Sequence, residues 1–323
     1  MASELPPGLR VALERELTGV SRRDLAGRAA ATSRAYRSGR GSAGVIRGRD
    51  DALAYALTRL PATFAACAAA FGEAQARAPG FAPASLLDAG CGPGGGTWAA
   101  REVWPSIARV DWLDASTPFL DLAQRLSAGT FEARITRGDL GATAPSATAL
   151  SAADLVLASY ALAEVAPAQQ LQVIDRLWDA TLGLLVLAEP GTPAGYARIL
   201  AARDALLARG ANLLAPCAHA APCPLAAPDW CHFAVRLPRS RDHKAAKGVD
   251  APFEDEPYAY LVAARPGVAG GPAPARVLAQ PRAGKPGIDL KLCTPDGLER
   301  RFVPRRDKAA HAVARRLDWG DAL

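Results

Sequence analysis

The sequence feature that most constrains the fold is the stretch from Leu86 to Thr97, which reads LLDAGCGPGGGT. A short apolar run ends in an acidic residue, Asp88, and a loop containing five glycines follows before a predicted helix. Glycine permits a tight turn, so backbone N–H groups and the helix N-terminus can approach a ligand closely. The order strand, glycine loop, helix predicts a nucleotide-type cofactor site at a parallel sheet, and a plain tight turn is the alternative.

The region from residue 84 to about residue 190 alternates short apolar runs with helical patterns, which is typical of a doubly wound sheet. The predicted strands are Ser85–Asp88, Val110–Asp114, Ala133–Arg137, Asp154–Ser159 and Leu184–Ala188. The predicted helices are Thr97–Val103, Thr117–Ala128, Pro167–Thr181 and Ala194–Arg209. Ligands of such sheets bind outside the carboxyl ends of the strands, so the residues at those ends are the site candidates.

Acidic residues stand at or just after the ends of the first three predicted strands: Asp88, Asp114 and Asp139. Asp114 lies 24 residues after Gly90, where a carboxylate can accept hydrogen bonds from both ribose hydroxyls of a nucleoside. Asp139 follows the third strand, where it can receive an adenine amino group. We therefore expect the three carboxylates to line one cofactor site.

The spacing of Gly90, Gly92 and Gly94 decides among cofactors. The loop lacks the Lys-Ser/Thr pair of a phosphate-binding loop and does not follow the strict Gly-x-Gly-x-x-Gly of dinucleotide binders. Acidic surroundings would repel the phosphates of NAD, whereas S-adenosylmethionine carries a cationic sulfonium and an amino group. The pattern resembles that of class I S-adenosylmethionine-dependent methyltransferases.

A catalytic group is harder to identify. Amino-directed nucleic-acid methyltransferases usually carry an Asn/Asp-Pro-Pro-aromatic motif after the fourth strand, but this chain reads Ser159-Tyr160-Ala161-Leu162 there. A nucleophilic cysteine of the kind used by cytosine C5 enzymes is missing from the ends of the fourth and fifth strands. Tyr160 and Glu164 are the candidates that remain near the pocket.

Three cysteines, Cys217, Cys223 and Cys231, fall within fifteen residues, and Cys293 follows in a predicted strand end. Prolines beside the first two stiffen the loop and reduce the entropy lost when ligands are ordered. Four thiolates suit tetrahedral zinc or an iron–sulfur cluster, and the spacing fits neither common pattern. The residues alone leave zinc, an iron–sulfur cluster and free cysteines open, with His219 and His232 as further zinc candidates.

Apolar residues at helical spacing predict helices through residues 1–80. Pro61 is expected to kink or divide the helix predicted from Asp50 to Phe71. Strands are predicted at Phe233–Leu237 and Tyr258–Ala264, joined by a polar, basic linker over Arg239–Lys247 that is either a mobile RNA-contacting loop or a solvated excursion. A proline- and glycine-rich segment, 266–274, marks a boundary. The predicted elements beyond it are strands Arg276–Gln280, Ile288–Cys293 and Arg300–Pro304 and a basic helix, Asp307–Leu317.

The net charge of +6 is unevenly distributed. Residues 1–50 hold 10 basic and 5 acidic residues, residues 265–323 hold 12 and 6, and the middle holds 16 and 21. Basic ends around an acidic centre indicate a polyanionic partner such as nucleic acid, or an ordinary solvated surface. No apolar run approaches the roughly 20 residues of a membrane span, and the first residues lack a secretory signal pattern. We expect a cytoplasmic protein with no membrane partner.

Together these stretches resemble the bacterial branch of the methyltransferase-like family associated with the mitochondrial ribosomal small subunit, the Rsm-type proteins. The resemblance covers nearly the whole chain. Its most specific parts are the proline-flanked cysteines with the sequence WCHF around Cys231, and the sequence LCTPDG around Cys293. The resemblance implies that Cys217, Cys223, Cys231 and Cys293 hold a 4Fe–4S cluster. It also implies action on the small ribosomal subunit or during its assembly, with rRNA as the polyanion.

We therefore expect an α/β fold of the class I methyltransferase type with a doubly wound sheet. The expected domains are an N-terminal helical region (1–80), a cofactor-binding domain (81–265) with a cysteine-rich metal loop inserted at about 215–232, and a small basic C-terminal β module with a helix (266–323). Two functions stand: an S-adenosylmethionine-dependent rRNA methyltransferase, or a non-catalytic iron–sulfur assembly factor that retains the cofactor pocket. Under both, Asp88, Gly90, Gly92, Gly94, Asp114 and Asp139 bind the cofactor.

Overall fold

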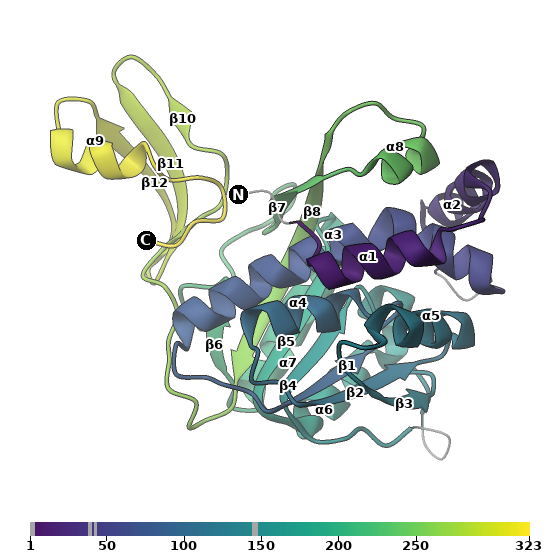
Figure 1. The fold of residues 1–323 in the computed structure, drawn as a ribbon. Helices are drawn as coiled ribbons and strands as arrows, with labels where there is room; N and C mark the ends of the chain where they lie inside the picture. The colour runs from purple at the N-terminus through teal and green to yellow at the C-terminus, as the bar shows by residue number, and fades with distance from the viewer. Residues whose placement is uncertain (1–3, 38–40, 42–43, 144–147) are drawn as a thin grey trace.

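A computed structural model describes residues 4–37, 41, 44–143 and 148–323. Residues 1–3, 38–40 and 42–43 of the predicted N-terminal helical region lie outside the described residues. The main sheet contains β1 (Ser85–Ala89), β2 (Arg109–Asp114), β3 (Arg134–Arg137), β4 (Ala153–Ser159), β5 (Thr181–Pro190), β6 (Asn212–Ala215), β7 (Phe233–Pro238) and β8 (Phe253–Ala264). The strand order is β3-β2-β1-β4-β5-β8-β6, with β7 also paired to β8 (Figure 1). Strands β1 to β5 pair in parallel, while β8 runs antiparallel to β5, β6 and β7. The mixed sheet and its helices form a methyltransferase-like α/β fold, as the sequence predicts.

Helices cover both faces of the sheet. One apolar cluster joins it to α1 (Pro7–Glu16), α3 (Arg49–Arg77), α4 (Gly95–Val103) and α5 (Thr117–Ser127). A second cluster joins the opposite face to α6 (Gln170–Ala180) and α7 (Pro193–Ala208). The central strands β1, β4 and β5 are therefore buried on two sides, which explains why they read as nearly continuous apolar runs in the sequence.

The predicted strands and helices of this region are confirmed with small shifts at their ends. The largest shift affects the helix expected over Pro167–Thr181, where two short 3-10 turns, Leu162–Glu164 and Pro167–Gln169, precede α6. The four-residue strand β6 was not predicted. It is short, and its hydrogen-bonding partner β8 lies about 50 residues later, so no local pattern marks it.

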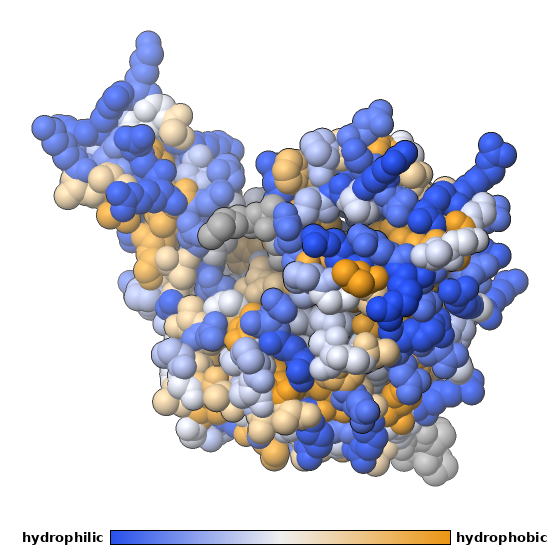
Figure 2. All heavy atoms as spheres, in the orientation of Figure 1, coloured by the Kyte–Doolittle hydropathy of each residue, from blue (hydrophilic) through white to orange (hydrophobic). Residues whose placement is uncertain are grey.

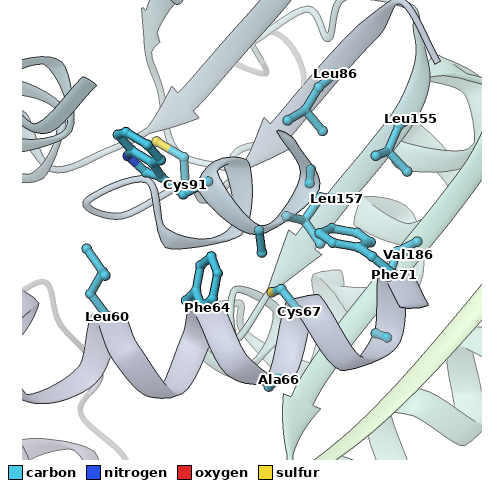
Figure 3. Packing of buried hydrophobic residues seen from close by; sticks show 14 of the residues in the cluster. Leu60, Phe64, Ala66, Cys67, Phe71, Leu86, Cys91, Leu155, Leu157 and Val186 are labelled. Atoms are coloured by element: carbon cyan, nitrogen blue, oxygen red, sulfur yellow. The ribbon is translucent and has the colours of Figure 1, made fainter. Parts of the chain in front are cut away.

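Helix α3 runs through Pro61 without a break over 29 residues, so the expected division at this proline is wrong. Its length and apolar composition alone would allow it to cross a membrane, but two thirds of its most apolar window are buried inside the protein. Figure 3 shows Leu60, Phe64 and Cys67 pointing from α3 toward the glycine loop and the sheet. Helix α3 is a core helix, and Cys67 is one of its buried apolar residues.

The expectation of a mobile or solvated linker over Arg239–Lys247 is also wrong, because a helix, α8 (Arg241–Lys247), occupies this segment. It packs against α2 (Arg22–Arg37) and α3. Two basic residues of the segment make internal contacts: Arg239, which precedes the helix, and Lys247 both pair with Glu254, at 3.2 and 2.6 Å. A helix of two turns is too short to show a clear period in the sequence.

Helix α3 is joined to the sheet by an ion pair between Arg59 and Glu256 on β8, with an N–O distance of 3.0 Å. Replacing Arg59 with alanine should lower the free energy of unfolding by about 3–5 kcal/mol, because it leaves a buried carboxylate without its counter-charge. Replacing Arg236, whose pair with Asp255 is exposed, should cost far less. Urea unfolding of both variants measures the difference. Equal losses would show that the Arg59 pair contributes no more than a surface contact.

The C-terminal residues form a separate four-stranded sheet made of β9 (Arg276–Val277), β10 (Arg282–Ala283), β11 (Gly287–Thr294) and β12 (Gly297–Pro304), with α9 (Lys308–Ala314) against it. In Figure 1 this module projects from the body of the protein, next to the ends of β7 and β8. Strands β9, β11 and β12 agree with the predicted positions, although β9 is shorter, and the two-residue strand β10 was not predicted. Helix α9 is shorter than the expected Asp307–Leu317. The proposed boundaries between domains stay a prediction.

Candidate functional site

The glycine loop lies at the carboxyl ends of β1 and β4, where the strand order reverses direction. This is the topological switch point at which doubly wound sheets bind their ligands. A cavity of about 20 Å³ lies between the glycine loop, Ser159 at the end of β4, and three residues of α3. The three α3 residues are Tyr55, Leu60 and Thr63. The structure therefore has a small cavity beside the predicted cofactor loop.

Asp88 lies beneath the loop and is completely buried. Its Oδ2 accepts a hydrogen bond from the Thr97 hydroxyl (2.7 Å), and the Thr97 oxygen in turn accepts one from Trp112 Nε1 (2.8 Å). Its Oδ1 is buried without a hydrogen-bond partner. Burial in this setting raises the pKa of Asp88 to about 7. A buried carboxylate oxygen without a donor is suited to a ligand that brings a cation or an N–H group.

Asp114 is the second carboxylate at this edge. It accepts hydrogen bonds from the backbone N–H groups of Gly92 and Ser116, both at 2.8 Å. Each carboxylate oxygen can accept a further hydrogen bond, so two hydroxyl groups of a ribose can be received. Burial raises the pKa of Asp114 above its usual range, and Glu164 is among the charges that contribute. The pair of acids makes the loop a site for a positively charged or hydroxyl-rich ligand.

Gly90, Gly92 and Gly94 all have positive φ angles, between 53° and 86°. A side chain at Gly90 would also meet the Cβ of Ala161 at 2.7 Å, so the loop and the segment after β4 touch where only glycine fits. The three predicted glycines are therefore required by the shape of the loop.

The cavity holds about one water molecule and is too small for S-adenosylmethionine as it stands. The residues present fit the cofactor, with two hydrogen-bond-accepting acids and a backbone loop of glycines. The Tyr55 ring, which lines the cavity, packs against Phe119 of α5, with ring centroids 4.8 Å apart. The cavity therefore has to widen to hold the cofactor.

Of the predicted cofactor residues, Gly90 and Gly92 line this cavity, whereas Asp88, Gly94 and Asp114 do not. Asp139 is exposed, and its Oδ1 accepts a hydrogen bond from the N–H of Gly141 at 2.8 Å. The hydroxyl of Tyr160 donates to Glu256 of β8 at 3.1 Å, and its backbone has a φ of 57°, unusual for a non-glycine residue. Glu164 lies exposed in the turn after β4. Asp139, Tyr160 and Glu164 do not line the enclosed space by the loop.

The four cysteines Cys217, Cys223, Cys231 and Cys293 line one cavity of about 30 Å³. The first three come from the segment between β6 and β7, and Cys293 comes from β11 of the C-terminal module. The sequence prediction that distant cysteines meet is consistent with this placement. Within the described ranges, no three His, Cys, Asp or Glu side chains converge closely enough to hold a single metal ion.

Burial raises the pKa of the Cys217 thiol to about 11, although the nearby Arg203 guanidinium opposes the shift. Burial also raises the pKa of Cys231 well above its usual range. These thiols are therefore protonated at neutral pH unless a metal replaces their protons. The Cys223 sulfur accepts a hydrogen bond from the Tyr196 hydroxyl at 3.2 Å.

Several residues of these sites were not predicted. Thr97 and Trp112 hold Asp88, and Tyr55 and Thr63 enclose the loop, but all four belong to helical or strand patterns that looked like core. Arg203 of α7 is almost fully buried and donates to the carbonyl groups of His219 and Ala221, at 3.2 and 2.5 Å, which shapes the cysteine loop. An arginine inside an apolar helical pattern is a signal that could have identified it.

Comparison with known proteins agrees with the resemblance. The family described as mitochondrial small ribosomal subunit Rsm22 matches residues 49–323. The human mitochondrial ribosome assembly protein METTL17 is 31% identical, over 84% of this chain and 62% of its own length, so the chain spans less than two thirds of that relative.

Two solved methyltransferase structures are similar at a low level. Magnesium protoporphyrin IX methyltransferase from Synechocystis PCC 6803, with bound S-adenosylmethionine, is 15% identical with a TM-score of 0.39, over 82% of this chain and all of its own. The N-methyltransferase NodS from Bradyrhizobium japonicum, with S-adenosylhomocysteine, is 12% identical with a TM-score of 0.40, over 61% of this chain and 85% of its own. The match over residues 49–323 decides the family: the chain belongs to the family described as mitochondrial small ribosomal subunit Rsm22.

Proposed function

We propose that this protein binds S-adenosylmethionine at the glycine loop and acts as a methyltransferase on small-subunit rRNA during assembly of the small ribosomal subunit in the cytoplasm. The observation that carries the proposal is the buried Asp88 beneath the loop, with one oxygen that lacks a hydrogen-bond donor. Asp88 would face the cationic part of the cofactor, and Asp114 would receive the ribose hydroxyls. The cofactor supplies an activated methyl group, and the chain has to hold the acceptor atom against it.

We also propose that Cys217, Cys223, Cys231 and Cys293 hold a 4Fe–4S cluster, with zinc as the alternative metal. The four cysteines line one cavity together. Four thiolates are the ligand set that both a 4Fe–4S cluster and a tetrahedral zinc ion take. The resemblance to the Rsm-type proteins supports the cluster. Such a cluster would join the C-terminal module to the methyltransferase-like domain.

A second function is favoured by one specific observation. The Tyr160 hydroxyl donates to Glu256, away from the loop, and Glu164 does not line the cavity. Neither catalytic candidate is therefore in position to take a proton from an acceptor in this conformation. This supports a non-catalytic assembly factor in which the cofactor stabilises the closed domain.

Methylation of small-subunit rRNA separates the two functions. Nucleoside mass spectrometry would compare wild-type cells with a deletion strain and with strains carrying Asp88→Asn or Asp154→Asn. Asp154 is the matched control, because it accepts hydrogen bonds from Ser85 at the opposite end of β1, away from the loop. A methyltransferase loses the same mark in the deletion and the Asp88→Asn strains and keeps it in the control. A deletion strain with every mark intact and defective subunits would overturn the catalytic proposal.

A further inference from the structure

The sheet of the C-terminal module has one covered face and one open face. Residues at alternate positions of β11, together with Val277 and Val303, pack with Ala314 of α9 and form the covered face. The opposite side chains of β12 are Leu298, Arg300 and Phe302, which pair in register with Cys293, Lys291 and Asp289 of β11. The Cys293 end of this face adjoins the cysteine cavity, and the Phe302 end is free.

Phe302 is the central side chain of the free end. It is 49% exposed, and its ring lies over Gly287 of β11. A Cβ at position 287 would meet the ring atoms Cζ and Cε2 at 2.7 and 2.9 Å, so only glycine leaves room for the ring. A single exposed aromatic residue is common on protein surfaces. This ring, however, is supported from beneath by the strand, which fixes an aromatic surface in place.

Basic residues are frequent at the free end, and one of them, Arg282, pairs in register with Asp289, which lies opposite Phe302. Six basic residues of the free end are exposed, and within the described chain none of them forms an ion pair. By contrast, Lys291 pairs with Asp229 at the body end of the sheet, and Arg301 pairs with Glu299. Figure 2 shows the module projecting from the body with mostly hydrophilic residues over its free end. The six residues are Arg282, Lys285, Arg300, Arg305, Arg306 and Lys308.

We infer that the open face of β10–β12 is a binding surface for single-stranded RNA, in which a base stacks on Phe302 and phosphates contact Arg300 and Arg282. Unpaired cations attract the backbone, and an exposed ring accepts the face of any base without regard to sequence. Duplex RNA hides its bases in the stack and cannot use the ring. The inference rests on the proposed role in ribosome assembly for the identity of the polyanion, but the surface is separate from the glycine loop.

Arg300 and Arg301 provide a matched pair of variants. They are adjacent in β12 and therefore point to opposite faces of the sheet, so Arg300→Gln and Arg301→Gln change the net charge equally on different sides. Phe302→Leu removes the aromatic ring but keeps an apolar side chain over Gly287. The full-length protein would be titrated into a fluorescently labelled 12-nucleotide RNA of mixed sequence and into the same RNA as a duplex. Circular dichroism would verify that each variant is folded.

The expected result is that the protein binds the single strand more tightly than the duplex. Phe302→Leu should weaken single-strand binding roughly ten- to hundredfold, as base–aromatic stacking predicts. Arg300→Gln should also make the dependence of log affinity on log salt shallower by about 0.7, and Arg301→Gln should leave both quantities close to wild type.

Three results would overturn the inference: equal affinity for duplex and single strand, wild-type binding by Phe302→Leu, or equal losses in the two arginine variants. If no oligonucleotide binds and Phe302→Leu still loses association with purified small subunits, the face belongs to a protein partner. Phe302→Leu should bind S-adenosylmethionine like the wild type. Loss of the RNA-binding inference is therefore distinguishable from loss of the proposed function, because the first is tested by RNA binding of Phe302→Leu and the second by rRNA methylation in the Asp88→Asn strain.

Discussion

Replacing Cys231 with alanine is expected to remove nearly all iron from the protein and to abolish the brown colour of material purified without oxygen. Cys231 is one of three cysteines from the loop between β6 and β7, whereas Cys293 belongs to β11 of the C-terminal module. The cluster would therefore link two parts of the chain that otherwise meet over a limited contact. Structural metal sites contribute on the order of 10 kcal/mol to folding, so a loss of several kcal/mol in stability should accompany the loss of iron.

Cys67→Ala is the matched control for this experiment. Cys67 is also buried, but it lies on α3 against the sheet and away from the cysteine cavity. This variant should lose some packing energy and keep its full iron content. Elemental analysis and visible absorbance measure both outcomes. Zinc without iron in the anaerobically purified wild type would contradict the cluster, and wild-type iron in Cys231→Ala would exclude Cys231 as a ligand.

Replacing Asp88 with asparagine is expected to stabilise the cofactor-free protein at pH 8 and to weaken S-adenosylmethionine binding at the same time. Burial raises the pKa of Asp88 from its ordinary 3.8 to about 7, so the folded protein binds this proton more tightly than the unfolded chain. The resulting stability is fully present below about pH 4 and is lost as the pH rises to about 7. The difference corresponds to roughly 4 kcal/mol, since one pKa unit is about 1.4 kcal/mol.

At pH 8 the wild type carries an ionised, buried carboxylate, and the neutral amide of Asp88→Asn avoids this cost. The amide still accepts the hydrogen bond from Thr97, but its N–H₂ group lacks an acceptor, so we expect a net gain of about 1–3 kcal/mol. Cofactor affinity should fall at least tenfold because the charge facing the cationic ligand is gone. Thermal unfolding at pH 5 and pH 8 and calorimetric titration measure these effects.

Asp154→Asn is the control that tells whether the changes in stability and cofactor affinity are specific to Asp88 or follow from replacing any hydrogen-bonded aspartate of the sheet. Asp154 accepts hydrogen bonds from the N–H groups of Ala84 and Ser85 at the amino ends of the strands. Its replacement should destabilise the protein and leave cofactor affinity unchanged. A stability loss in Asp88→Asn at pH 8, or unchanged cofactor affinity, would show that Asp88 is an ordinary core acid and does not bind the cofactor.

Local patterns predicted most of the main sheet, because its central strands are buried on both faces and the helices that cover it have one apolar side. They failed where the decisive interaction is distant. The basic segment Arg239–Lys247 looked like solvent-exposed linker, yet Glu254 of β8 and the surface of α2 hold it as a helix. Pro61 looked like a helix breaker, yet packing against the glycine loop and the sheet holds α3 as one continuous helix.

The sequence alone determined the type of loop, its three glycines and the two acids that follow β1 and β2, since these depend on backbone conformation and on residues close in the chain. The sequence also identified the four cysteines as candidate metal ligands, and the resemblance to a known family pointed from these candidates to an iron–sulfur cluster. Only the tertiary structure decided that Asp88 has a buried oxygen without a donor and that α3 side chains line the cavity beside the loop. It also decided that Cys293 joins the other three cysteines. Burial and contact between distant segments are properties of the packed chain, and no stretch of sequence contains them.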